Sequence, residues 1–269
     1  MSFLVNPYWY ASAGCADADA NAFLTAAGIT DATITSAICT LVTSMKADGT
    51  WAKCSAIYPM VGGTATTHKF NLKNPLDTNG AFRLTFTGGW THSANGALPN
   101  GTNAYANTFL TPSTTLTLLN THLSFYSRTS AIGNNQRDLA AFVGGSTPSF
   151  SIGTNTGVLI SDHYWFTTNR ISRSIPNAQG LMLTSRTNNT THKSYRNGVQ
   201  LGATDTVSNA GKAMPNISLF LGAANISGAG SFSNKQYAFA SIGSGLTDSE
   251  AAALYTAVQA FNTTLSRQV

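Results

Sequence analysis

Charged side chains are scarce in this chain of 269 residues: Asp, Glu, Lys and Arg together make up 9% of it, against roughly 25% in an average globular protein. Thirty-seven threonines, with abundant Asn, Ser, Ala and Gly, stand in their place. Thr fits the pleated surface of a strand, and Asn and Gly fit the turns between strands. Because 42% of the residues are hydrophobic, general disorder is excluded. The composition therefore predicts one large β-rich domain with a single core.

Cysteine is also scarce. The three cysteines are odd in number and have no C-x-x-C spacing, so they indicate neither a zinc site nor a disulfide framework. We expect all three to be buried free thiols: Cys15, Cys39 and Cys54.

Long apolar segments are missing as well. No run approaches the ~20 residues that span a bilayer, so we expect a soluble protein that does not bind membranes. A secretory signal peptide needs a basic start before its apolar stretch. Here the first lysine is Lys46, and Asn6 and Pro7 interrupt the apolar opening. We therefore expect no export by a signal peptide.

Helical patterns lie at the two ends of the chain. Asp17 can cap a helix that runs to Ala27. Thr30 or Asp31 can cap a second helix that ends at Gly49. The second helix carries one apolar stripe: Ile34, Ile38, Leu41, Val42 and Met45. A Thr-x-x-Glu capping box opens a last helix with its own buried stripe: Thr247, Glu250, Leu254, Val258, Phe261 and Leu265.

From Trp51 onward the apolar period changes to two, which predicts half-buried strands. In one of them, Leu123 and Phe125 alternate with polar or amphipathic neighbours. The clearest hairpin turns at Asn197 and Gly198, because Asn-Gly tolerates the positive φ of a type I′ turn. Many short strands without intervening helices predict a β-sandwich.

These patterns divide the chain into an arm over residues 1–14, a helical segment over residues 15–50 and a sandwich over residues 51–269 that ends in a helix. The arm is nearly uncharged and carries four aromatic residues: Phe3, Tyr8, Trp9 and Tyr10. It either inserts into a neighbouring subunit or packs on its own domain.

Five short segments of the second half share a recognisable pattern: 122–128 (HLSFYSR), 195–202 (YRNGVQLG), 219–223 (LFLGA), 239–243 (FASIG) and 246–250 (LTDSE). In this order they resemble the closing half of laminin-G and concanavalin A-like domains. The resemblance implies a mainly β fold, a concanavalin A-like (laminin-G-like) jelly-roll β-sandwich with short N-terminal helices and a C-terminal helix. Such sandwiches serve as adhesins, fibre tips, capsid decorations and glycosidases, so the fold by itself selects no function.

Three earlier segments, residues 22–51, 56–63 and 67–73, are similar to proteins carried by tailed bacteriophages and prophages, including crAss-like phages. This resemblance implies a virion structural protein, made in the host cytoplasm and released by lysis, that serves as a fibre, decoration or tail-associated protein. It implies homo-oligomers, other virion proteins bound through the arm, and host surface glycans as a further partner. Two alternatives stay open: a glycan depolymerase (glycoside hydrolase) on the same fold, and a pure assembly protein with no external ligand.

Carboxylates are too few and too scattered to favour the hydrolase. Glycosidases use two carboxyl groups, about 5 Å apart when the enzyme retains configuration. The one glutamate, Glu250, belongs to the capping box, and only four aspartates fall within the body of the sandwich: Asp77, Asp138, Asp162 and Asp205. Neither a G-x-S-x-G nor an H-E-x-x-H motif is present. We predict a protein that is not an enzyme.

No metal, cofactor or nucleic acid is predicted. The five histidines are scattered, and no nucleic-acid-binding motif occurs. Calcium, which needs six to eight oxygen ligands, stays an alternative at Asp138, Asp162 and Asp205 with nearby Asn. Seven basic residues between His122 and Gln200 either face an anionic partner or form ordinary solvated strand surfaces: Arg128, Arg137, Arg170, Arg173, Arg186, Lys193 and Arg196.

The segment His163-Tyr-Trp-Phe166 is the leading candidate for glycan contact. Sugar sites place an aromatic ring against the apolar face of a pyranose, with Arg or Asn at its hydroxyls. We therefore predict contacts from Trp165 and Arg170, with His163 beside them. A buried strand with Tyr164 inward and Trp165 half outward is the alternative. Trp90, in a Gly-rich loop region, is the other candidate, with core packing as its alternative.

Overall fold

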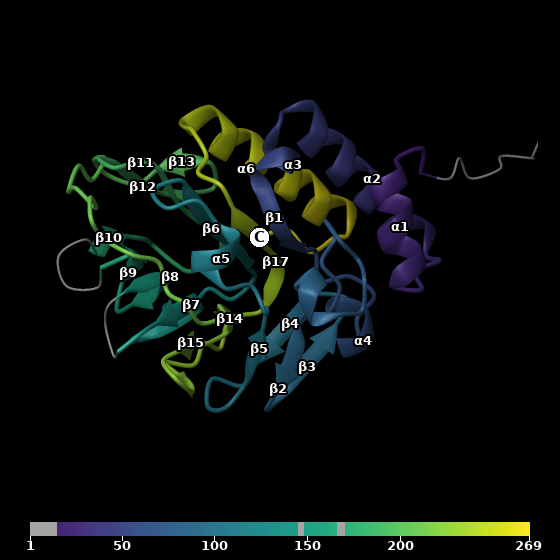
Figure 1. The fold of residues 1–269 in the computed structure, drawn as a ribbon. Coiled ribbons are helices and arrows are strands. Elements are labelled where there is room, and N and C mark those ends of the chain that lie inside the picture. The colour runs from purple at the N-terminus through teal and green to yellow at the C-terminus, as the bar shows by residue number, and fades with distance from the viewer. Residues whose placement is uncertain (1–14, 145–147, 166–169) are drawn as a thin grey trace, which may run out of the picture.

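Two β-sheets packed face to face make up most of the molecule, and helices cover one of them (Figure 1). The computed structural model describes residues 15–144, 148–165 and 170–269. The predicted arm, with its four aromatic residues, lies outside the described residues. No helix in the described ranges is long and apolar enough to cross a membrane. The predicted mainly β sandwich with N-terminal helices and a C-terminal helix is confirmed.

The first sheet has eight strands, and β1 (Cys54–Tyr58) joins it by pairing with β17. The other seven follow one another across the sheet: β13 (Val199–Gln200), β12 (Thr191–Arg196), β11 (Gly180–Asn188), β6 (Thr121–Ser127), β17 (Tyr237–Gly243), β4 (Gly96–Pro99) and β3 (Trp90–Ser93). All its pairings are antiparallel.

The second sheet has nine strands. From one edge of the sheet to the other, seven of them are neighbours in this order: β10 (Arg170–Ser174), β9 (Val158–His163), β8 (Ser149–Asn155), β7 (Gln136–Phe142), β14 (Phe220–Leu221), β5 (Tyr105–Asn107) and β2 (Thr85–Thr87). The short β15 (Ala224–Asn225) pairs in parallel with β7 and antiparallel with β16 (Ala229–Gly230).

The helices gather mainly on the outer face of the eight-stranded sheet (Figure 1). They are α1 (Ala18–Ala26), α2 (Ala32–Ala47), α3 (Thr50–Lys53) and α6 (Asp248–Thr264), while single turns form α4 (Ala65–His68), α5 (Pro112–Thr115) and the 3-10 turn η1 (Asn79–Ala81). Asp17 and Asp31 cap α1 and α2. The predicted capping box of Thr247 and Glu250 is confirmed at the start of α6.

Burial on both faces of the eight-stranded sheet corrects the prediction of half-buried strands. Every residue of β6 and β17 is buried. Phe125 faces the nine-stranded sheet, whereas its neighbour Tyr126 packs in the apolar cluster under the helices. In β17 the register shifts between Tyr237 and Phe239, so these two rings face opposite layers instead of sharing one face. The helices are the cause, because they remove the outer face from water.

The cysteines differ from the prediction in two of three cases. Cys15 and Cys39 form a disulfide, with Cα atoms 5.6 Å apart. Their separation of 24 residues shows no recognisable motif, and only the pairing of α1 with α2 brings them within bonding range. Cys54 is the buried free thiol that was predicted, and burial raises its pKa to about 12.

The predicted Asn-Gly hairpin is confirmed. Strands β12 and β13 pair with Arg196 opposite Val199. The two turn residues between them both have positive φ: 51° at Asn197 and 76° at Gly198. The Asn197 side chain also accepts a 2.9 Å hydrogen bond from the amide of Leu181. The turn therefore joins β12 to β13 and is also hydrogen-bonded to the neighbouring strand β11.

Candidate functional site

His163, at the end of β9, points between the sheets and has no exposed surface. Its ring nitrogens lie 3.2 Å from the hydroxyls of Thr121 and Thr184. The Thr184 hydroxyl lies 2.8 Å from Nε2 of His192, whose ring centroid is 4.1 Å from that of His163. Burial, with His192 and Arg186 nearby, holds the pKa of His163 well below its usual value. An enclosed ring cannot touch a surface glycan, so we remove His163 from the candidate site.

Tyr164 is buried and Trp165 is partly exposed, as the buried-strand alternative predicts. Its φ is positive, at 77°, and its side chain turns inward like that of the preceding His163. The Tyr164 hydroxyl lies 2.7 Å from the hydroxyl of Thr121 and accepts a hydrogen bond from the amide of Leu119. The polar core at this end of the sandwich therefore anchors the residue that precedes Trp165.

Trp165 is partly exposed and lines a hollow of about 200 Å³ together with Tyr164 and Lys212. The Lys212 Nζ lies 3.7 Å from the centroid of the indole ring, within the range of a cation–π contact. No carboxylate in the described part of the chain forms an ion pair with Lys212. Lys212 was not among the predicted site residues, since nothing in the sequence around it marks it.

Arg170, the first residue of β10, is bound to a buried carboxylate. Its Nε and Nη2 each lie 2.8 Å from an oxygen of Asp162, and the Ser151 hydroxyl donates to the same carboxylate at 2.7 Å. Asp162 has no exposed surface, whereas 24% of the Arg170 side chain is exposed. The guanidinium therefore ties β10 to β9, and its primary role is to hold the sheet edge.

Trp90 lies in β3, near the opposite end of the sandwich from β10 (Figure 1). Its indole Nε1 donates to the main-chain oxygens of Thr87 and Tyr105. The ring packs against the inter-sheet core and stacks on His92. Trp90 and Trp165 therefore do not form one site, and the geometry of Trp90 matches its core-packing alternative.

The seven basic residues between His122 and Gln200 are largely occupied within the chain. Arg137 and Arg186 are buried. The others hydrogen-bond to side chains or main-chain oxygens, or form ion pairs: Arg128, Arg170, Arg173, Lys193 and Arg196. They brace the fold, and so do not leave a row of free cations for an anionic partner.

The aspartates considered as calcium ligands bind other side chains of the protein or lie far from one another. Asp138 accepts hydrogen bonds from Ser233 and Tyr237, and Asp162 binds Arg170. Among the described residues, no three His, Cys, Asp or Glu side chains are grouped so as to hold a metal ion. The structure therefore adds nothing to the calcium alternative.

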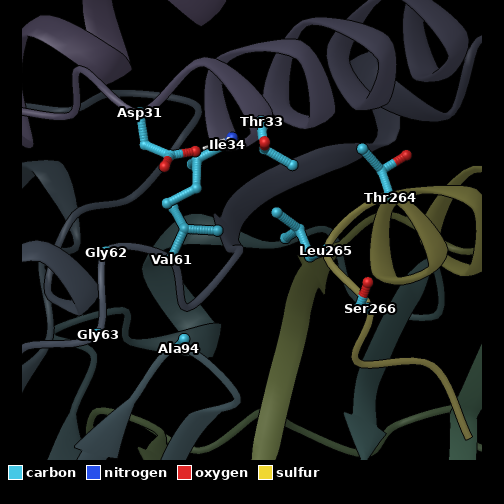
Figure 2. Close-up of a pocket in the computed structure, with 10 residues that line it drawn as sticks. All are labelled: Asp31, Thr33, Ile34, Val61, Gly62, Gly63, Ala94, Thr264, Leu265 and Ser266. Atoms are coloured by element: carbon cyan, nitrogen blue, oxygen red, sulfur yellow. Dashed lines mark hydrogen bonds between the residues drawn. The ribbon is translucent and has the colours of Figure 1, made fainter.

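A larger pocket, about 470 Å³, lies elsewhere and was not foreseen (Figure 2). It is bounded by the start of α2, by residues 61–63 after β1, by the β3–β4 turn at Ala94 and by residues 264–266 at the end of α6. Its walls come from four distant stretches of sequence. The only local signal was the cap at Asp31 and the Gly62-Gly63 pair.

No protein-family model and no curated protein matches the chain. Among solved structures, the chain is similar to a mutant of Trypanosoma rangeli sialidase displaying trans-sialidase activity, with a TM-score of 0.55, 10% identity and coverage of 84% of this chain and 39% of that one. It is also similar to the same sialidase in complex with 2,3-difluorosialic acid, with a TM-score of 0.52, 11% identity and coverage of 81% and 38%.

A third similar structure is the binding domain of botulinum neurotoxin serotype D, with a TM-score of 0.50, 8% identity and coverage of 77% of this chain and 52% of that one. The chain thus spans about two fifths of the sialidase chains and about half of the toxin domain. At these identities the likeness establishes the β-sandwich fold.

Proposed function

We propose that this chain is a non-enzymatic, lectin-like module that binds an acidic glycan in the hollow beside Trp165. The observation that carries the proposal is the Lys212 ammonium, 3.7 Å from the centroid of a partly exposed indole ring. The part of the indole that Lys212 does not cover offers an apolar surface to a pyranose ring. The ammonium offers charge-assisted hydrogen bonds to a carboxylate or sulfate on the sugar. The formal net charge of +5 also favours approach of an anionic partner.

The state of the carboxylates supports binding over hydrolysis. A glycosidase needs an acid and a second carboxylate that both face the scissile bond. Asp138 and Asp162 have no exposed surface, and both lie against cations: Asp138 beside Lys235, Asp162 with Arg170. Glu250 accepts the hydrogen bonds of its capping box. None of these groups is placed as a catalytic pair toward the hollow.

The proposal extends to the setting of the module. The segments that resemble tailed-phage proteins support a virion structural role as a fibre, decoration or tail-associated protein. In that role the chain forms homo-oligomers, attaches to other virion proteins through residues 1–14 and leaves the host by lysis. The sandwich, which is not part of the attachment, would then present the Trp165 hollow to host glycans.

A glycan array with a parallel assay for released reducing sugar tests the proposal. We expect wild-type protein to bind glycans that carry carboxylate or sulfate groups, without sugar release. Trp165→Ala and Lys212→Gln should each weaken binding about tenfold or more, because they remove the apolar surface or the charge. Lys73→Gln is the matched control: it removes an ammonium 4.0 Å from the centroid of Trp51, in the helical layer, and should leave binding unchanged.

Three results would contradict the proposal. Binding that survives both substitutions would place the glycan elsewhere. Release of reducing sugar would make the protein a hydrolase. Absence of binding to every glycan would favour the pure assembly role.

A further inference from the structure

The pocket of Figure 2 has the size of a small-molecule site. Its volume of about 470 Å³ is more than twice that of the hollow beside Trp165, and it lies within the range of about 300–1,000 Å³ typical of ligand pockets. Ile34, Val61 and Leu265 supply apolar side chains between the start of α2 and the end of α6 (Figure 2). A compact ring with one apolar face fits between such walls.

A buried arginine holds the lower wall in place. Arg267 has no exposed surface, and its guanidinium donates to the main-chain oxygens of Pro59, Met60 and Ala238 at 2.7–2.8 Å and to that of Ala94 at 3.5 Å. Burial lowers the pKa of Arg267 to about 9, so the group stays charged at neutral pH. The loop after β1 and the β3–β4 turn are therefore bound to one rigid cation, and the pocket exists before any ligand arrives.

Several polar groups around the pocket are exposed to solvent, fully or in part, and form no hydrogen bond with the described part of the chain. They are the second carboxylate oxygen of Asp31, the hydroxyls of Thr33 and Ser266, and the peptide groups of Gly62 and Gly63. The two glycines have φ values of 87° and 74°, and a Cβ on Gly62 would lie 2.7 Å from Thr67. Their backbone therefore stays bare at the pocket wall, with donors and acceptors suited to ligand hydroxyls.

The one charged side chain that lines the pocket is negative. Asp31 is its only charged lining residue, and no lysine, arginine or histidine is among the residues that line it. The end of α6 contributes the negative end of a 17-residue helix, and the start of α2 contributes the positive end of a 16-residue helix, so the two helix dipoles offset each other. Arg267 lies behind the wall and keeps its positive charge, but its donors are used by main-chain carbonyls, so it offers no hydrogen bond to a ligand. Because Asp31 is the charged group that faces the pocket, a cationic group on the ligand is favoured over an anionic one.

We infer that this pocket is a second binding site, separate from the Trp165 hollow, for a small polyhydroxylated ring that carries an amine, such as an amino sugar. The ring lies against Ile34, Val61 and Leu265, its hydroxyls replace water at the solvent-exposed polar groups of the wall, and its ammonium pairs with Asp31. The two sites thus select ligands of opposite charge. The inference does not depend on the function proposed for the Trp165 hollow.

Titration of the full chain with D-glucosamine, D-glucose and D-glucuronate, followed by amide chemical shifts, tests the inference. We expect glucosamine to bind most tightly, glucose more weakly and glucuronate least, with shifts at residues 31–34, 61–63 and 264–266. Asp31→Asn should weaken glucosamine binding about fivefold, the effect of one partly solvated charge pair, and leave glucose unaffected. Asn caps a helix as well as Asp does, so α2 should keep its stability.

Thr33→Lys provides the stronger test, because it places an ammonium at the pocket mouth. It should abolish glucosamine binding, whereas Thr43→Lys, an exposed position on the same helix, should not. Equal affinity for glucosamine and glucose, no effect of Asp31→Asn, or no binding of any probe would overturn the inference. Trp165→Ala should leave glucosamine binding intact; loss in that variant would also overturn it. Failure here therefore stays distinguishable from failure of the acidic-glycan proposal.

Discussion

The two buried layers of the molecule are built from different chemistry. The layer under the helices centres on an apolar cluster, in which the stripes of α2 and α6 pack on Tyr126 and Phe239. The layer between the sheets also has an apolar centre. In addition, it contains the Asp138–Lys235 ion pair and the adjacent imidazoles of His163 and His192. Apolar packing is non-directional, whereas a buried polar group costs free energy unless its partner is in place. Substitutions should therefore destabilise the inter-sheet layer more than the layer under the helices.

Removal of the buried lysine should have the largest effect on stability. Lys235 and Asp138 have no exposed surface, and Lys235 Nζ lies 3.5 Å from the Asp138 carboxylate and 2.7 Å from Gln136 Oε1. Lys235→Met should lower the free energy of unfolding by about 3–5 kcal/mol, because Asp138 is left buried without its cation. Urea denaturation measures the loss. Adding Asp138→Asn should recover part of it; a double variant less stable than the single one would refute the explanation.

Truncation in the helical layer should cost somewhat less. Leu254 of α6 is fully buried in the apolar cluster under the helices. Leu254→Ala should lower the free energy of unfolding by about 3 kcal/mol, from lost transfer free energy and the cavity left behind. The same urea experiment gives the value. If this truncation proves more damaging than Lys235→Met, the contrast between the two layers is wrong.

Acidification should weaken both layers, because burial also lowers the pKa of His122, which lies against Ser241 and Ser244 on the helix-covered face, to about 4. Burial holds the pKa values of His163 and His192 well below the usual 6.5, so the folded protein keeps both rings neutral while the unfolded chain takes up protons. Stability is therefore complete above pH 6.5 and falls as the pH drops below it. At pH 5.5 each of these histidines should cost on the order of 1 kcal/mol. Urea midpoints at pH 7.5, 6.5 and 5.5 check this; a midpoint constant down to pH 5.5 would contradict it.

Local chemistry accounts for the features that could be predicted. Thr247 and Glu250 satisfy each other's backbone donors within one turn of helix, so the pattern specifies its own structure. Asn197 and Gly198 accept positive φ wherever they stand, and the hairpin follows. The stripes of α2 and α6 identified their buried faces because helical periodicity is an internal property of a segment.

The candidate site depended on contacts between distant segments and was only partly foreseen. Trp165 was identified by its chemistry, but its cation comes from Lys212, which no local motif marked. His163 turned inward because Thr121, Thr184 and His192 offered partners from the facing sheet. Arg170 was predicted as a ligand contact, yet its bidentate partner Asp162 was known only once β9 and β10 were paired.

By itself, the sequence determined a mainly β sandwich with capped helices at both ends, since alternation, turn residues and caps act over a few residues. The tertiary structure alone decided that Cys15 joins Cys39, that helices bury the second face of a sheet, and that the pocket beside Asp31 exists. Each of these depends on which segments meet in space. Pairing of distant segments is set by the free energy of the whole core, which no short stretch of sequence encodes.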